Sequence, residues 1–157
     1  MIKIFNAEKE LKLSYTKELD LKIEHVLSNG DKTLSFLIPI NSKLTTVLEE
    51  EGYIETKDHC FVIKGINSNF KNCNVIAKLN VEELEGKFFK KFEAVEATAK
   101  ATINSILVDT GWSVGYSNIK KKRTTRRESK NAFELIQVVK KIFNCDIVFD
   151  TKNTIKI

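Results

Sequence analysis

Residues 98–116, TAKATINSILVDTGWSVGY, and residues 131–149, NAFELIQVVKKIFNCDIVF, decide the fold because they match at an offset of 33 residues, from 98 to 131. In each stretch, apolar residues first recur at helical spacing and then alternate with polar residues, which predicts a helix followed by a strand. Thr98 and Asn131 are the expected N-caps, and Gly111 and Asn144 are expected to end the two helices. We therefore expect two α–β repeats whose apolar helix stripes are buried against one face of a small sheet.

The region before these repeats is typical of β-structure. Short apolar or alternating segments are separated by turn residues, and Asn29-Gly30 predicts a tight hairpin turn. The expected strands are Ile2–Phe5, residues 21–27, Thr33–Ile38, Tyr53–Thr56, Cys60–Ile66 and Asn74–Leu79. We expect the alternating strand at 21–27 to be half-buried. Short strands at this spacing predict a small barrel or sandwich.

Two short helices are expected among these strands. Residues 41–43 open the first, an apolar stripe follows at residues 44–48, and Gly52 ends it. The second is a single helical turn over residues 80–86, capped by Asn80.

The charge distribution predicts a domain boundary near residue 95. Residues 1–95 hold 14 Lys/Arg against 15 Asp/Glu, a balance of −1, whereas residues 96–157 hold 12 against 6, a balance of +6. The predicted fold class is therefore α+β, with a β-rich, barrel-like domain over residues 1–95. A small α/β domain with two α–β repeats follows over residues 96–157, and we expect it to be incomplete because the chain stops on a strand-like segment.

Several classes of protein are disfavoured by composition and motifs. No apolar run reaches the roughly 20 residues of a membrane span, and the first residues lack a signal-peptide core. Cys60, Cys73 and Cys145 are far apart and are expected to be free thiols, with no metal site and no cofactor. Phosphate-binding loops, nucleophile elbows and zinc motifs are absent from the sequence, so we predict no catalytic residues.

A basic run is the most conspicuous charge feature. Its six cations are Lys120, Lys121, Lys122, Arg123, Arg126 and Arg127. Three interpretations stay open: a solvated loop or edge strand, a contact with an acidic neighbour in an assembly, and a small nucleic-acid-binding module formed by residues 120–127. The run lacks interleaved aromatic residues, which disfavours single-strand binding. Trp112 is expected either to pack in the core or to anchor a contact.

The order of several sequence words resembles a known family. The words are Leu27–Phe36 followed by Pro39, then Tyr53–Asp58, Phe61–Lys64, Val75–Gly86, Thr110–Gly115 and Val139–Asp150. Together they resemble the N-terminal region of minor structural proteins of the prophage tail-endopeptidase family, which are tail-associated hub proteins of Gram-positive siphophages and their prophages.

The resemblance implies a structural role at the tail tip of a virion. It implies a homotrimeric hub in which residues 1–95 form the first ring domain and the repeats after Thr98 begin an inserted domain. The implied partners are other tail proteins: a distal tail protein, a tape measure protein and fibre regions. Composition indicates no membrane partner, and nucleic acid is the less favoured partner of the basic run. The protein would be synthesised in the host cytoplasm. Any peptidase activity of the family lies outside the matched segment, so the resemblance assigns no catalytic residue to this chain.

Overall fold

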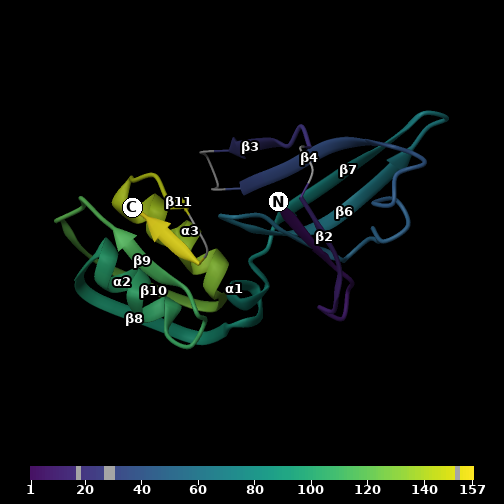
Figure 1. Cartoon of the computed structure of the whole chain (residues 1–157). Coiled ribbons are helices and arrows are strands. Elements are labelled where there is room, and N and C mark those ends of the chain that lie inside the picture. The colour runs from purple at the N-terminus through teal and green to yellow at the C-terminus, as the bar shows by residue number, and fades with distance from the viewer. Residues whose placement is uncertain (17–18, 27–30, 151–152) are drawn as a thin grey trace. The chain divides into compact units, whose positions relative to one another are not determined.

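The computed structural model describes residues 1–16, 19–26, 31–150 and 153–157, and these form two compact units (Figure 1). The first unit comprises Met1–Val26 and Asp31–Asn80, and the second comprises Val81–Ile157. The division therefore falls after Asn80, whereas the boundary expected near residue 95 lies inside a continuous strand. The excess of Lys and Arg residues begins only towards the end of that strand. The change in charge along the sequence therefore lies later than the boundary between the two compact units.

The first unit is one antiparallel seven-stranded sheet. Its strand order is β2-β1-β5-β6-β7-β4-β3. The bounds are Ile2–Phe5 (β1), Leu11–Tyr15 (β2), Lys22–Val26 (β3), Asp31–Pro39 (β4), Tyr53–Glu55 (β5), Cys60–Ser68 (β6) and Asn72–Leu79 (β7). The strand segments expected from the sequence are present, although Asn29-Gly30 lies outside the described residues.

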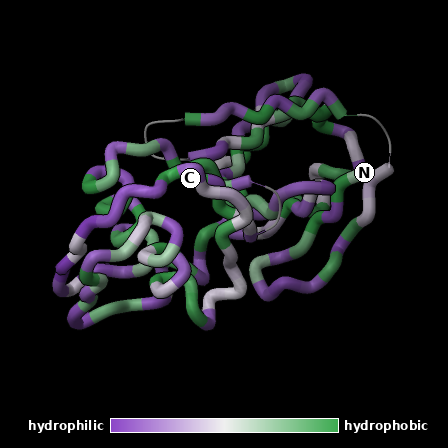
Figure 2. The backbone as a smooth tube through the Cα atoms, turned by 90° about the vertical axis from the view of Figure 1, so that its left-hand side faces the viewer, coloured by the Kyte–Doolittle hydropathy of each residue, from purple (hydrophilic) through white to green (hydrophobic). Residues whose placement is uncertain are grey.

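Alternating apolar residues build the core of this unit. Along β4, Leu34, Phe36 and Ile38 are buried, while the residues between them are more exposed. Hydrophobic and hydrophilic residues alternate over short stretches of the backbone, as the period of a strand requires (Figure 2). Phe61 and Val75 join the same core from β6 and β7.

The strand-rich α+β architecture is as expected, but the sheet of the first unit is not a closed barrel. Among the described residues, β2 pairs only with β1 and β3 pairs only with β4. The expectation that residues 21–27 form a half-buried strand is also wrong in one respect, because all five residues of β3 are exposed.

The helix expected over residues 41–52 is absent, and consecutive turns take its place. The side chains of two threonines explain the difference. Thr45 Oγ1 donates to the carbonyl oxygens of Ile40 and Ser42, and Thr46 Oγ1 donates to that of Lys43. Such local side-chain hydrogen bonds compete with the helical pattern. Leu44 is still fully buried, so the predicted apolar contact forms without the helix.

The second unit contains three helices and two small sheets among its described residues. The bounds are Glu82–Gly86 (α1), Phe88–Thr98 (β8), Ala99–Leu107 (α2), Ser113–Tyr116 (β9), Lys122–Asn131 (β10), Ala132–Phe143 (α3), Val148–Phe149 (β11) and Thr154–Lys156 (β12). β8 and β10 pair antiparallel, and the second sheet has the order β11-β12-β9 with β12 parallel to β9.

Three of the four helix ends predicted from the repeat, at Thr98, Asn131 and Asn144, are confirmed. The Thr98 side chain accepts a hydrogen bond from the backbone N–H of Ala101, and Asn131 forms a capping box with Glu134. Asn144 adopts the left-handed conformation with a φ of 49° at the C-cap of α3. Gly111 has a φ of 74° but does not end α2, which stops at Leu107 with Val108 as its C-cap. The expected cap of α1 is wrong, because Val81 occupies the N-cap position and the backbone N–H of Asn80 donates to Cys60 instead.

The 33-residue repeat extends further than its helices and following strands. A long strand precedes each helix, β8 before α2 and β10 before α3. Two residues before each N-cap, Glu96 and Ser129 have positive φ angles of 48° and 52°. Each repeat is therefore a strand–helix–strand unit, and the two leading strands pair with each other.

All three cysteines are free, with Cys73 buried and Cys60 and Cys145 partly buried. No helix in the described part of the chain is long and apolar enough to cross a membrane.

Candidate functional site

The predicted basic run forms the first part of β10 and the two residues before it. Lys122, Arg123, Arg126 and Arg127 lie in β10, and Lys120 and Lys121 precede the strand. β10 pairs with β8 over its whole length, from Lys122 opposite Thr98 to Asn131 opposite Phe88. The solvated form of the basic run was expected to be either a loop or an edge strand, and in the structure residues 122–127 belong to a strand.

Opposite charges pair across the β8–β10 ladder. Arg126 Nε lies 2.5 Å from Glu93 Oε1, and these two residues are directly opposite each other. Two positions along on each strand, Lys91 lies opposite Glu128. Cross-strand pairs of opposite charge each contribute roughly 0.2–1 kcal/mol to a sheet. The Glu93 carboxylate thus neutralises one cation of the basic run, Arg126.

Five cations of the run remain without a carboxylate partner among the described residues. They are Lys120, Lys121, Lys122, Arg123 and Arg127, and all five are exposed. Arg127 Nη1 donates to the carbonyl oxygen of Arg126 at 2.7 Å. This backbone contact orients the guanidinium and leaves its charge available. The five cations can therefore attract an anionic surface, and salt screens that attraction because they are exposed.

The core of the second unit supports the ladder that carries these cations. Thr125 is fully buried and Phe92 is 6% exposed, while Arg126 and Glu93 beside them are exposed. Helix α3 packs against β10, and α2 packs against both strands. The basic strand is therefore held by its ladder with β8 and by Thr125, the one residue of β10 that is buried. Thr125 Oγ1 forms no hydrogen bond with any described residue.

The second candidate residue, Trp112, lies in the core of the same unit. It is 7% exposed, and its ring meets the Phe149 ring edge-on, with centroids 5.5 Å apart. Phe149 in turn stacks on Phe133 at 5.8 Å. The structure does not bring Trp112 together with the basic run at the surface. Its burial matches the packing interpretation, which leaves it out of the candidate contact surface.

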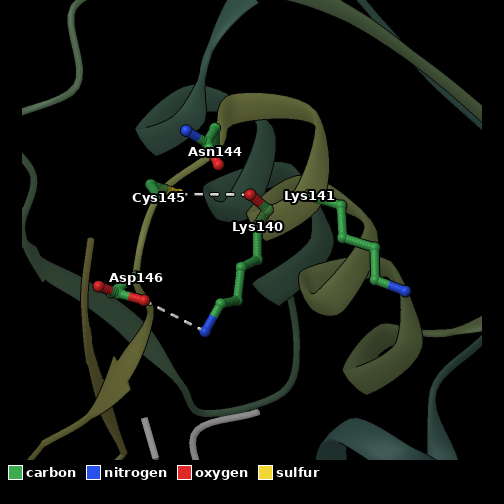
Figure 3. Close-up of a pocket in the computed structure, with 5 residues that line it drawn as sticks. All are labelled: Lys140, Lys141, Asn144, Cys145 and Asp146. Carbon is green, nitrogen blue, oxygen red and sulfur yellow. Dashed lines mark hydrogen bonds and ion pairs between the residues drawn. The ribbon is translucent and has the colours of Figure 1, made fainter. Parts of the chain in front are cut away.

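An open pocket lies at the C-terminal end of α3, and Figure 3 shows its lining. Lys140 Nζ lies 3.4 Å from Asp146 Oδ1, and Cys145 Sγ is 4.0 Å from the carbonyl oxygen of Lys140. Burial raises the pKa of the Cys145 thiol, and the carboxylate of Asp146 acts in the same direction against the lowering effect of Lys140. Because a thiolate is the nucleophilic form of cysteine, this environment disfavours covalent catalysis by Cys145.

Sequence reasoning missed the acidic half of the ladder. No motif or charge run in the sequence marks Glu93 or Glu128. One signal was present, since the 33-residue offset places Glu93 on Arg126. Extending the repeat towards the N-terminus would have identified this pair.

Comparisons with known proteins give a family match for part of the chain. Residues 87–157 match the model described as "Prophage endopeptidase tail domain". This match covers most of the second unit, including β8, the basic strand and both repeats. The resemblance to prophage tail proteins is confirmed for that segment. No curated protein matches the chain.

Three solved structures share the fold. Prophage tail protein gp18 from Listeria monocytogenes EGD-e has a TM-score of 0.64 at 15% identity, covering 99% of this chain and 49% of its own. A tail protein from Neisseria meningitidis MC58 has a TM-score of 0.62 at 5% identity, with 99% and 49% covered. The 43 kDa tail protein of prophage MuSo2 from Shewanella oneidensis has a TM-score of 0.59 at 9% identity, with 99% and 53% covered. The chain thus spans about half the length of these structures.

Proposed function

Since residues 87–157 carry a prophage endopeptidase tail domain, we propose that the chain is the N-terminal part of a tail hub at the virion tail tip. It acts by assembly with itself and with neighbouring tail proteins, as a homotrimer in the full-length hub of a phage or prophage of a Gram-positive host. The family match is the observation that carries this proposal. The shared fold of three tail proteins, which extends over 99% of the chain, supports it for the first unit as well.

Within this proposal, the β-rich N-terminal part is a ring domain of the hub, and the repeats begin an inserted domain. The open sheet of the first unit suits a ring component, because its terminal strands β2 and β3 each have an edge that no described strand occupies. Strand edges of this kind pair readily with other chains.

The basic strand is the proposed contact for an acidic neighbour. Three exposed cations on a strand that is paired with β8, and two exposed lysines just before it, provide a positive surface, and arginine is enriched at protein interfaces. The candidates for this neighbour are the distal tail protein, the tape measure protein and the fibre regions. The proposal gives no catalytic residue to this segment, and it places any peptidase activity of the family outside it.

Labelling of intact particles tests the location. An epitope-tagged copy is expressed from the prophage, and gold-labelled antibody is located on negatively stained virions. We expect label at the distal end of the tail. Label along the tail tube, or virions that lack the tagged protein, would contradict a tail-tip role.

Charge reversal tests the contact surface. Lys121→Glu with Arg123→Glu should weaken binding to a purified neighbouring tail protein by about tenfold or more, and added salt should weaken wild-type binding in the same direction. Lys100→Glu, an exposed cation on α2, is the matched control and should leave binding unchanged. Equal binding by the double variant and the control rules out the basic strand as the contact.

The five unpaired cations also favour a second candidate, a small nucleic-acid-binding module. Binding to generic duplex DNA would then weaken by roughly one log unit per log of salt for each phosphate contacted. Absent or salt-independent binding excludes it. The β10 strand itself carries no aromatic residue for base stacking, so the assembly contact is the better-supported function.

A further inference from the structure

The tip of the β6–β7 hairpin presents an aromatic side chain entirely to solvent. Phe70 is 103% exposed, the highest value among the large apolar residues described. The turn beneath it is ordered by its own hydrogen bonds, because Asn69 Oδ1 accepts from the backbone N–H groups of Lys71 and Asn72 at 2.9 and 2.8 Å. An exposed aromatic side chain on an ordered turn is suited to anchor a contact, since the backbone beneath it loses little conformational freedom on binding.

The same hairpin has a strand edge that is unpaired. We call residues 64–72 the arm, and the hairpin that carries it extends beyond the other strands of its sheet (Figure 1). β5 pairs with β6 only over Cys60–Val62, and the last backbone bonds on that side join Ile63 to residues 51 and 52. From Gly65 to Ser68, β6 pairs only with β7 among the described residues.

The free edge of the arm lacks the residues that usually prevent pairing with a strand of another chain. Beyond Lys64, whose ammonium is 2.7 Å from Glu51 Oε2, the only charged residue of the arm is Lys71. Proline and inward-pointing charges, which usually block edge pairing, are missing from the arm. A Cβ atom at Gly65 would have no neighbour closer than 3.8 Å. The arm is therefore open to the close approach of another backbone.

A second free edge lies on the other side of the same sheet, where β3 is the last strand among the described residues. All five residues of β3 are exposed, and Ile23 and Val26 expose 46% and 45% of their surface. β3 pairs with Asp31–Ser35, the first half of β4, whereas the arm continues past Pro39 at the other end of β4. The two free edges thus belong to opposite sides and opposite ends of one sheet. They cannot meet within one chain, but they can meet between two copies arranged head to tail.

We propose that the arm of one copy pairs along its free β6 edge with β3 of a second copy, and that Phe70 covers apolar side chains of that β3. This inference rests on the proposed self-assembly and identifies the residues through which two copies bind each other. The two partner surfaces differ, so the contact is heterologous and can close into a ring. A lipid surface fits less well, because one aromatic residue anchors weakly and the unpaired backbone groups of β6 would lose water without gaining partners.

Photo-crosslinking of the whole chain locates the contact. Phe70 is replaced by the photoreactive residue benzoylphenylalanine, and the crosslinked peptides are identified by mass spectrometry. We expect an adduct between two copies that maps to residues 22–26. An adduct that maps to the arm of the second copy, or to any surface other than β3, overturns the proposal.

Sedimentation equilibrium of variants measures how much the arm and β3 contribute to the affinity of self-association. Phe70→Ser and Ile23→Lys should each raise the self-association Kd at least tenfold, while Phe88→Ser, at a residue that is 61% exposed in β8, should leave it unchanged. Thermal unfolding of each variant verifies that the fold is kept. A wild-type chain that stays monomeric up to about 1 mM, or a Phe70→Ser chain that associates like wild type, overturns the proposal.

Mixing the two variants tests the head-to-tail arrangement. The Phe70→Ser chain retains β3 and the Ile23→Lys chain retains the arm, so an equimolar mixture should form a heterodimer with near wild-type affinity. A symmetric arm-to-arm contact would give no such recovery and would exclude this arrangement. If Phe70→Ser chains still enter virion tails and self-associate normally, this inference fails while the proposed function stands.

Discussion

Glu93 and Arg126 lie 33 residues apart in the sequence and directly opposite each other in the β8–β10 ladder, joined by an ion pair of 2.5 Å. Because 33 residues is also the repeat offset, the two residues occupy equivalent positions of the two repeats. An antiparallel ladder that pairs equivalent residues has a local twofold axis between them. Identical charges at this position would repel across the ladder, and the opposite charges remove that conflict.

Reversing one charge of this pair should therefore destabilise the second unit. Arg126→Glu places two carboxylates opposite each other, and we expect the free energy of unfolding in urea to fall by about 1 kcal/mol. Both side chains are partly exposed, which keeps the effect small. The exchange Glu93→Arg with Arg126→Glu should recover most of the loss. A double variant as unstable as the sum of the two single variants would show that the residues do not interact.

Thr125 occupies the position of the second repeat that corresponds to Phe92, and both residues are buried. Because its hydroxyl has no hydrogen-bond partner among the described residues, replacement by an apolar group of similar shape removes a desolvation cost. Thr125→Val should raise the free energy of unfolding by about 1 kcal/mol in thermal or urea denaturation. Thr125→Ser, which keeps the hydroxyl and loses a methyl group, is the control and should lower it by about 1 kcal/mol. A less stable valine variant would indicate that the hydroxyl is satisfied.

Local patterns predicted the second unit well, for a physical reason. Thr98, Asn131 and Asn144 bond to backbone groups a few residues away, so their effects can be predicted from a short window of sequence. The buried helix stripes follow from spacing alone. The strand that pairs with β10 could not be predicted in this way, because the pairing of Arg126 with Glu93 depends on how the two repeats pack against each other.

The errors in the first unit arise where tertiary context decides. Residues 41–52 have helical spacing, but Thr45 and Thr46 bond back to the backbone and turns result. β3 alternates like a half-buried strand, yet it lies at the end of the sheet and stays exposed. Phe70 carried no sequence signal, because one phenylalanine among ten becomes conspicuous only when its exposure is known.

The two caps of the repeat should differ in strength. Asn131 forms both hydrogen bonds of a capping box, whereas Thr98 accepts a single one from Ala101 at 3.2 Å. We expect Asn131→Ala to lower the free energy of unfolding by about 1.5 kcal/mol and Thr98→Ala by about 1 kcal/mol. Asn131→Asp retains the acceptor and should cost far less than Asn131→Ala. Equal losses for the aspartate and alanine variants would contradict a capping role for Asn131.

The stability of the first unit should fall in mild acid because His25 is partly desolvated and lies beside Lys32. His25 is opposite Lys32 in the β3–β4 ladder, and His59 Nε2 is 2.8 Å from Lys32 Nζ. Partial desolvation, followed by the charge of Lys32, lowers the pKa of His25 below its usual 6.5. The unfolded chain then binds this proton more readily than the folded chain. Stability is therefore greatest above pH 6.5 and falls as the pH decreases below that value.

The measurement is urea unfolding of the intact chain at a series of pH values from about 7.5 to about 5.5, followed by a signal from the first unit. This window lies above the range in which carboxylates such as Glu24, whose pKa is lowered from 4.5 by Lys22, begin to titrate. His25→Gln removes the titrating group at an exposed position, so the variant should show a shallower loss of stability with acid than the wild type. His59 keeps its contact with Lys32 in this variant. An unchanged slope in His25→Gln would show that the proton affinity of His25 is the same in the folded and unfolded chain.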